Sequence, residues 1–266
     1  DKFIMGVLKQ IDGNNYYVFE NDFNNGEYFT FATDVKAPGG VVSGLSWWYA
    51  GDKGVYTDNK GLVYRWSDMG PNGLDVRQAT ATKRPNAAGV KNFNPVVRFS
   101  GAQELVAAAG VYKLNTAYNQ FTDFAAAYTN GGTANTIFYS EKIRLAATNT
   151  TAYYQWMSLP GSGTALYWGA NHATGTSLQT IPYSTTTSPY ATDIYSGVYN
   201  ASSTPKLLAF NKNGAAAVAS TTGAATFYGG NNPLYIGSLY GGNFFSGIAN
   251  ELIHYDRALT STEINK

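Results

Sequence analysis

Oxygen-bearing side chains recur in one stretch of the chain, between positions 52 and 75. Carboxylate and amide oxygens are the ligands that Ca²⁺ prefers in proteins, so this stretch makes calcium the metal that the sequence predicts. The spacing differs from that of an EF-hand loop, and Asp or Asn in a turn usually accepts hydrogen bonds from its own backbone amides, so calcium binding is the functional alternative to that structural role. The candidate ligands are Asp52, Asp58, Asn59, Asp68, Asn72 and Asp75.

Tryptophan side chains supply a second kind of chemistry, because an aromatic face can stack on the C–H face of a sugar. Trp47 and Trp48 are neighbours in a run that reads as a strand, so their side chains are expected on opposite faces. One of them then fills the interior, and the other lies on an outer face or under a loop. The candidate carbohydrate-binding residues are Trp48, Trp156 and Trp168.

The residues of a hydrolase or a transferase are not grouped in this sequence. A retaining glycosidase needs two carboxylates about 5 Å apart, but Glu251 and Asp256 are an odd number of residues apart on an expected strand and should face opposite sides. No Gly-x-Ser-x-Gly elbow or Gly-rich phosphate loop occurs. His172 and His254 are scattered and Cys is absent, which argues against zinc. We therefore expect no catalytic residues and no organic cofactor.

The elements that must position these residues read as strands. Turn signals such as Asp12-Gly13, Asn25-Gly26 and Asn213-Gly214 recur between short aromatic and β-branched runs, a pattern typical of an all-β sandwich. Tyr is abundant, with 21 residues against 3 Met, which also favours strands. We predict an antiparallel two-sheet sandwich of jelly-roll type, with strands over residues 16–19, 28–33, 45–49, 62–66, 95–99, 136–139, 152–156, 165–168, 206–210 and 248–255. Residues 107–110 and 125–127 fit either a buried strand or a helical turn.

Composition limits the partners and the location. Charged residues make up 13% of the chain and the formal net charge is +1, so nothing draws the chain to nucleic acid or to an anionic membrane surface. No apolar run is long enough for membrane insertion. A surface made polar by Thr, Ser, Asn and Gly is typical of secreted modules. The chain opens at Asp1 without a signal peptide, so we expect a segment of a longer polypeptide with adjacent modules.

Two parts are expected along the chain. Lys36-Ala37-Pro38-Gly39-Gly40 reads as a joint. Residues 1–38 then form a β-rich flank, which is either the end of a preceding module or extra strands on the main domain. Residues 39–266 form the sandwich. Near its end, Thr260 and Glu263 form a capping box that predicts the start of a helix.

Several motifs resemble those of a known family. They are Gly44-Leu45-Ser46-Trp47-Trp48-Tyr49, Asn92-Phe93-Asn94-Pro95-Val96-Val97-Arg98-Phe99-Ser100, and the closing Ile248-Ala249-Asn250-Glu251-Leu252-Ile253-His254-Tyr255. In this order they resemble the laminin G-like, concanavalin A-like lectin modules of very large surface adhesins that gliding bacteria export through the type IX pathway. Arg98 and Ser100 depart from the resemblance, because an acidic residue is usual near these positions.

The resemblance implies a fold and a function. The fold is the concanavalin A-like, laminin G-like sandwich. The function is that of a non-catalytic adhesin module, secreted to the bacterial cell surface, which binds an extracellular polysaccharide or another surface ligand in adhesion or gliding. Calcium is a possible cofactor. Because one fold serves many functions, a structural spacer without a ligand and a polysaccharide hydrolase are the alternatives.

Overall fold

The chain forms two compact units, Asp1–Val35 and Lys36–Lys266. The computed structural model describes residues 7–12, 14–18, 22, 24–25, 37–87, 89–91, 94–107, 117–129, 136–144, 153–159, 166–172, 177–183, 192–204, 207–214, 218–220, 227–239 and 241–266. In the first unit, β1 (Val7–Ile11) and β2 (Asn14–Val18) pair as an antiparallel hairpin. Asp12 lies at its turn with a φ of 50°, a conformation that Asp tolerates better than most residues.

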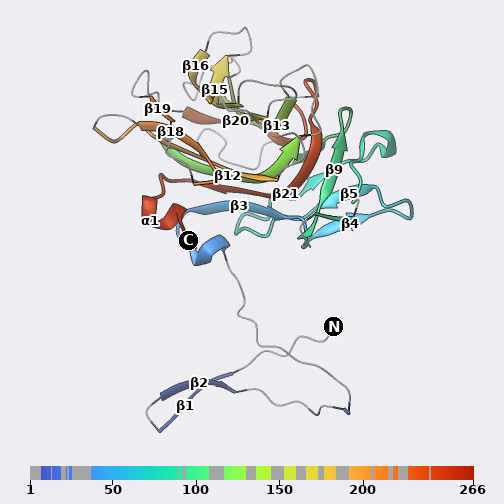
Figure 1. Cartoon of the computed structure of the whole chain (residues 1–266), viewed down its shortest axis with the longest axis vertical. Helices are drawn as coiled ribbons and strands as arrows, with labels where there is room; N and C mark the ends of the chain where they lie inside the picture. Colours follow the sequence, from blue (N-terminus) through green and yellow to red (C-terminus); the bar gives the residue numbers. More distant parts are fainter. Residues whose placement is uncertain are drawn as a thin grey trace. The chain divides into compact units, whose positions relative to one another are not determined.

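The larger sheet of the second unit is built from long central strands and short strands at one edge (Figure 1). Each pairing in it is antiparallel. Within the described residues, the order across the sheet is β16 (Ser177–Tyr183), β15 (Leu166–His172), β14 (Tyr153–Leu159), β13 (Thr136–Arg144), β20 (Phe227–Ile236), β10 (Leu105–Ala107), β6 (Val76–Arg77), β5 (Val63–Trp66) and β4 (Val55–Thr57), with β11 (Ala117–Tyr118) beside β20.

The smaller sheet is also antiparallel throughout its described part. Its order is β19 (Val218–Ser220), β18 (Leu207–Lys212), β17 (Asp193–Asn200), β12 (Gln120–Thr129), β21 (Ser246–Tyr255) and β3 (Leu45–Ala50), with β9 (Val97–Ser100) also paired to β21. The remaining elements are a small hairpin of β7 (Val90–Lys91) and β8 (Asn94–Pro95), two short 3-10 helices η1 (Pro38–Gly40) and η2 (Ala81–Lys83), and helix α1 (Ser261–Ile264).

The two sheets enclose one aromatic-rich core. Trp47 and Tyr49 of β3 meet Trp66 of β5, and the side chains of Phe99 and Phe138 are fully buried in the same cluster. Burying side chains of this size contributes about 2–3 kcal/mol each to folding. The expected two-sheet antiparallel sandwich is therefore confirmed, and Trp47 is the member of the Trp47–Trp48 pair that fills the interior. Residues 125–127, left open between strand and helix, lie in β12.

A second, smaller cluster lies on the other face of the smaller sheet. Trp48, next to Trp47 on β3, packs there with Ile253 and Tyr255 of β21 and with Leu259 beyond the end of that strand. Because successive residues of a strand face opposite sides, the Trp47–Trp48 pair contributes one ring to each cluster. Figure 1 shows α1 beside β3, and Ile264 of this helix packs against the second cluster. None of the helices in the described part of the chain has the length and apolar character needed to cross a membrane.

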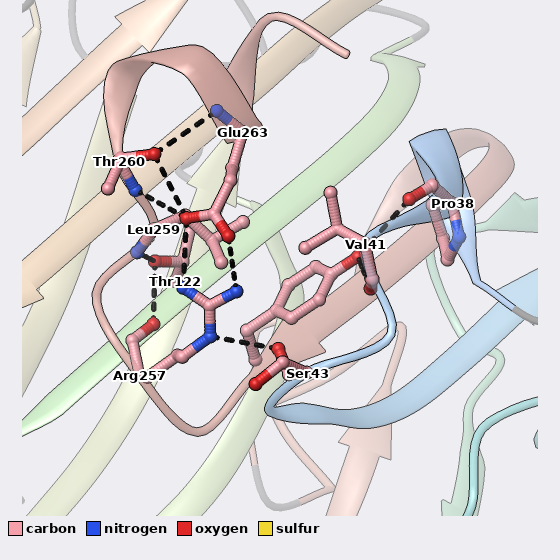
Figure 2. Close-up of polar contacts among 9 residues, drawn as sticks. Pro38, Val41, Ser43, Thr122, Arg257, Leu259, Thr260 and Glu263 are labelled. Carbon is pink, nitrogen blue, oxygen red and sulfur yellow. Dashed lines mark hydrogen bonds and ion pairs between the residues drawn. The ribbon is translucent and has the colours of Figure 1, made fainter.

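The two ends of the second unit are fastened to each other (Figure 2). Tyr255 donates its hydroxyl to the carbonyl of Val41 at 3.0 Å, and Arg257 Nε donates to the carbonyl of Ser43 at 2.8 Å. The Arg257 guanidinium also holds Glu263, and Thr260 caps α1 through the predicted capping box. We call this group, made of Val41, Ser43, Tyr255, Arg257, Thr260 and Glu263, the terminal clasp.

Candidate functional site

Two exposed tyrosines stand on the hairpin at the edge of the larger sheet. Tyr56 of β4 is 44% exposed and Tyr64 of β5 is 39% exposed, and their ring centroids lie 6.5 Å apart. The opposite face of the same strands carries Val55, Val63 and Trp66, which pack on the core. The hairpin is thus anchored through one face and presents aromatic side chains on the other.

An irregularity in strand pairing brings the two tyrosines together. Tyr56 pairs with Arg65, but the next residue of β4, Thr57, pairs with Val63, so Tyr64 is passed over. Such a bulge inserts an extra residue into one strand and redirects its side chain. Regular alternation would place Tyr64 and Arg65 on opposite faces, whereas here both are in reach of Tyr56.

Arginines extend this aromatic pair across the sheet. Arg65 lies between Tyr56 and Arg77 in the register of β4, β5 and β6, and its guanidinium carbon is 4.7 Å from the centroid of the Tyr56 ring. Asp75 holds both arginines: its Oδ2 is 2.8 Å from Arg65 Nε and 3.2 Å from Arg77 Nη2. The cation–π contact and the ion pairs together restrict the Tyr56 and Arg65 side chains.

Arg84 braces the hairpin from the following loop. Its Nη1 is 3.0 Å from Asp58 Oδ2, while Nε and Nη2 donate to the carbonyls of Gln78 and Ala79. Its guanidinium carbon is also 5.8 Å from the Tyr64 ring centroid. Backbone N–H groups of the β4–β5 turn, that of Leu62 first, and the Arg84 guanidinium lower the pKa of Asp58, so this carboxylate stays charged at neutral pH.

We call the group formed by Tyr56, Tyr64, Arg65, Asp75, Arg77 and Arg84 the Tyr–Arg surface. It combines exposed aromatic faces, a fixed array of N–H donors and an acceptor, all on one side of an edge hairpin. Aromatic rings offer large apolar faces at low conformational cost, and guanidinium groups offer planar forks of donors. Chemically, this arrangement suits a ligand with both apolar C–H faces and hydroxyl or acidic oxygens.

The predicted calcium ligands are only partly brought together. Asp68 and Asp75 are neighbours, since the backbone N–H of Asp68 donates to Asp75 Oδ1 at 3.1 Å. Asp68 accepts from the N–H groups of Trp48, Gly70 and Leu74 at 2.7–2.8 Å. Burial raises the pKa of Asp68, and the charge of Asp75 adds to this, against the effect of those donors. The carboxylate therefore fastens the β5–β6 loop to β3.

The other candidates lie apart from this pair. Asn72 donates through its amide nitrogen to the carbonyl and the hydroxyl of Ser46, Asp58 is engaged by Arg84, and the side chains of Asp52 and Asn59 are exposed in two different turns. Over the described residues, no three His, Cys, Asp or Glu side chains gather in a way that could hold a metal ion. Calcium binding stays a prediction, and the described carboxylates Asp58, Asp68 and Asp75 have structural roles.

Trp48 does not offer a face to a sugar. Its side chain is 6% exposed, its Nε1 donates to Glu251 Oε1 at 2.6 Å, and Lys53 Nζ lies 5.8 Å from the ring centroid. Residues before β3 and after β21 cover the rest of it. The expectation that Trp48 binds carbohydrate is therefore corrected: it faces outward from the sheet, as predicted, but other parts of the chain pack over it.

The other two candidate tryptophans lie on central strands of the larger sheet. Trp156 belongs to β14 and Trp168 to β15, where the backbone of Trp168 pairs with that of Met157. The side chains of both tryptophans lie outside the described residues. Their role in carbohydrate binding stays a prediction. The side chain of His172 of β15 also lies outside the described residues.

Glu251 and Asp256 are the two carboxylates near the C-terminus that a hydrolytic pair would require on one face. Glu251 bonds Trp48 on the outer face, whereas Asp256 Oδ1 lies 3.1 Å from His254 Nε2, whose ring stacks on Trp47 of the core. The two carboxylates thus face opposite sides, as their odd spacing predicts. His254 is fully buried, and its Nδ1 lies 2.6 Å from Asp123 Oδ1, which gives it a packed, hydrogen-bonded role.

Apart from Asp75, which was a candidate calcium ligand, the residues of the Tyr–Arg surface were absent from the sequence-based candidates. Tyr56 lies between Val55 and Thr57 on a short strand. Alternation predicts that Tyr56 and its neighbours face opposite sides of the sheet. It does not predict that Tyr56 shares a site with another residue. The signal that could have found the surface is a Tyr in each short strand of one hairpin, Tyr56 and Tyr64, with Arg65 directly after the second. The bulge at Tyr64 leaves no comparable trace in the sequence, because it depends on pairing with β4.

Comparison with known proteins defines the fold but no sequence family. No protein-family model matches the chain, and no curated protein matches it. Among solved structures, domain 4 of an extracellular GH43 arabinanase from Geobacillus stearothermophilus, in complex with arabinotriose, is similar with a TM-score of 0.52 and 18% identity. That match covers 83% of this chain and 96% of the arabinanase domain.

Two larger proteins contain a similar region. Trypanosoma rangeli sialidase in complex with sialic acid matches with a TM-score of 0.52 and 14% identity over 84% of this chain, which spans only 32% of the sialidase. The binding domain of Paraclostridial Mosquitocidal Protein 1 matches with a TM-score of 0.50 and 13% identity, over 77% of this chain and 51% of that one. At these identities the likeness concerns the fold alone.

The two stacked antiparallel sheets and these likenesses place the second unit in the concanavalin A-like class of β-sandwiches. The expected fold is thereby confirmed. Proteins of one fold differ in function, so the function has to be argued from the Tyr–Arg surface.

Proposed function

We propose that this chain is a non-catalytic, carbohydrate-binding module of an adhesin on the bacterial cell surface. The observation that carries the proposal is the Tyr–Arg surface, in which Tyr56 and Tyr64 are exposed side by side and are braced by Arg65 and Arg84. Rings held in place before binding lose little entropy when a ligand stacks on them. Sugars, with apolar C–H faces and hydroxyl rims, have the matching chemistry.

Two of the structurally similar proteins support a binding function. The arabinanase domain was solved with arabinotriose, and the mosquitocidal protein match is described as a binding domain. The resemblance of the Trp47-Trp48 strand and the closing strand to adhesin modules of gliding bacteria favours a secreted, surface-attached protein. Export through the type IX pathway, a place in a longer chain of modules and a requirement for calcium are parts of this proposal.

The terminal clasp favours a binding module over a spacer. A Cβ atom built on Gly39 would lie 2.9 Å from the carbonyl carbon of Lys266. A chain that continues beyond Lys266 therefore leaves the sandwich beside the point where the chain enters it. A module attached in this way adds little to the length of a filament and instead projects from it, which suits ligand capture.

Several described carboxylates are engaged in ways that suit structure better than hydrolysis. Glu104 is buried and pairs with Lys83 and the Ser238 hydroxyl, and Asp193 is buried beside Lys212 Nζ at 2.7 Å. Asp68 and Asp75, which lie close together, have backbone and arginine partners on their oxygens. An acid catalyst needs a carboxyl that can exchange its proton with the substrate, so we propose no hydrolytic step.

A glycan array with the purified chain, run with calcium and with a chelator, tests the proposal. We expect retention of at least one oligosaccharide, and we expect Tyr56→Ala and Tyr64→Ala each to weaken it by about tenfold, the scale of a central aromatic contact. Tyr56→Phe keeps the ring and should retain most binding. Ile194→Ala is the matched control, because Ile194 is 57% exposed on β17 of the other sheet.

Three results would contradict the proposal. Absence of any retained glycan would favour the spacer. Release of new reducing ends from a polysaccharide would show a hydrolase. Equal loss of binding in the Tyr56 and Ile194 variants would show that the Tyr–Arg surface is not the site, provided that both variants keep the melting temperature of the parent chain.

A further inference from the structure

Arg77 differs from the other arginines of the Tyr–Arg surface in how few of its donors are used. Its side chain is 62% exposed, and its described polar contact is the 3.2 Å pair between Nη2 and Asp75 Oδ2. A guanidinium has two edges that can each bind a carboxylate through parallel N–H groups, and this contact uses one edge at most. By contrast, Arg84 spends all three nitrogens on Asp58, Gln78 and Ala79.

The ion pair between Arg77 and Asp75 can be broken at little cost in stability. Asp75 is also the partner of Arg65, at the shorter distance of 2.8 Å, and it accepts from the Asp68 N–H. A solvent-exposed ion pair contributes between zero and about 1 kcal/mol. If Arg77 turns toward a ligand, Asp75 therefore keeps two partners and little stability is lost.

Register places Arg77 in line with the aromatic surface. Tyr56, Arg65 and Arg77 are consecutive partners across β4, β5 and β6, and adjacent strands are about 4.8 Å apart, so Tyr56 and Arg77 are roughly 10 Å apart. A ligand that stacks on Tyr56 or Tyr64 and extends along this row by a further sugar unit meets the Arg77 guanidinium.

The charge around this row is positive although the chain is nearly neutral. The Tyr–Arg surface and the segments that border it carry Lys60, Arg65, Arg77, Lys83 and Arg84, against Asp58, Asp68, Asp75 and Glu104. The formal net charge of the whole chain is only +1. A local excess of cations favours an anionic partner there.

From these observations we infer that the Tyr–Arg surface selects oligosaccharides that carry carboxylate groups, with a sugar ring on Tyr56 and Tyr64 and a uronate-type carboxylate on the free edge of Arg77. This inference rests on the proposed carbohydrate-binding function and names its ligand class. Arg65 acts as a positioning residue, because it holds the Tyr56 ring and stays bound to Asp75.

Matched charged and neutral ligands test the selectivity. The probes are trigalacturonate and glucuronate-bearing xylan oligosaccharides, each compared with its methyl ester by titration calorimetry on the full chain. We expect the acids to bind about tenfold more tightly than their esters at low salt, and the difference to shrink as sodium chloride screens the charge. Arg77→Gln should reduce the affinity for the acids to near that for the esters, because the free guanidinium edge is lost.

Arg98→Gln is the control for charge, because Arg98 lies exposed on β9 of the other sheet and its loss changes the net charge equally. It should leave the preference for acids intact. Equal binding of acid and ester, or an unchanged preference in Arg77→Gln, would overturn the inference. If the esters still bind in a manner that Tyr56→Ala weakens, the proposed function stands while the selectivity fails. If neither the probes nor any arrayed glycan binds, both fail.

Discussion

The guanidinium of Arg257 and the carboxylate of Glu263 face each other through two hydrogen bonds, from Nη1 to Oε2 at 2.9 Å and from Nη2 to Oε1 at 2.6 Å (Figure 2). Two parallel bonds of this kind fix both position and orientation. The same guanidinium donates through Nε to the carbonyl of Ser43. Glu263 in α1 is thereby tied to the loop that precedes β3, so the pair joins the first and last parts of the sandwich.

The first prediction concerns the pH dependence of this pair. The Arg257 guanidinium and the Thr260 N–H lower the pKa of Glu263 to about 2. A carboxyl with a lowered folded-state pKa stabilises the fold above its unfolded pKa of 4.5, and this stability is lost as pH falls toward 2. Glu263→Gln should therefore melt below the parent chain at pH 7, and the gap should close between pH 4.5 and 2.

Thermal melts at several pH values measure this gap. Asp52→Asn is a suitable control, because Asp52 is exposed and its substitution removes one acidic charge without touching the terminal clasp. Its gap to the parent chain should vary little over the same range. A Glu263→Gln gap that is constant from pH 7 to pH 2 would show that the charge of Glu263 does not contribute to the clasp.

Local signals in the sequence predicted the closing part of the fold well. The Thr260–Glu263 capping box is present as predicted, since it depends on residues three apart in the chain. The strands around Trp47, Trp66 and Phe99 were also found, because alternation of apolar side chains fixes their buried faces. The strand β17 was missed, since Asp193, Ser196 and Gly197 interrupt its apolar pattern although Tyr195 and Tyr199 fill the core.

Contacts between distant residues could not be predicted. Trp48 was correctly expected on an outer face, but its burial depends on Val41 and Leu259, which lie before β3 and after β21. The Tyr–Arg surface depends on a bulge whose origin is the pairing of two strands. The partner of His254, Asp123, is 131 residues away in the sequence. In each case the deciding contact is tertiary, and residue type alone does not encode it.

The second prediction concerns His254 and Asp123. Both side chains are fully buried, with Nδ1 and Oδ1 2.6 Å apart, and Asp256 approaches the other ring nitrogen. A buried polar atom that loses its hydrogen-bonding partner costs the desolvation of that atom. Asp123→Ala would leave the buried His254 Nδ1 without this partner, and we expect a loss of about 1–3 kcal/mol in the free energy of unfolding by urea.

Asp256→Ala is the matched comparison for this pair. Asp256 is 39% exposed, and its distance to the ring is 3.1 Å, so water can replace it and the loss should be below about 1 kcal/mol. Equal losses in the two variants would mean that burial does not distinguish the two carboxylates, and would contradict the prediction.

The third prediction separates the two adjacent tryptophans from the Tyr–Arg surface. Trp47 is fully buried in the core and Trp48 is nearly so in the second cluster. Removing a large buried aromatic side chain costs about 3–5 kcal/mol, so Trp47→Ala and Trp48→Ala should both be destabilised in urea unfolding. The folded fraction of Trp48→Ala should bind glycan as the parent does. Loss of binding with unchanged stability would instead restore Trp48 as a site residue.

The fourth prediction concerns Glu251, which accepts the Trp48 Nε1 hydrogen bond at 2.6 Å. Burial raises the pKa of this carboxyl, although the bond from Trp48 opposes the shift. An acid with a raised folded-state pKa keeps its proton to a higher pH in the folded state, so the contribution of Glu251 to stability should fall as pH rises above 4.5. Glu251→Gln keeps an oxygen for Trp48 and removes the buried charge. Urea unfolding at pH 4.5 and at pH 7 measures this effect. The variant should gain stability relative to the parent as pH rises. A stability difference that is the same at both pH values would mean that burial does not penalise the Glu251 charge.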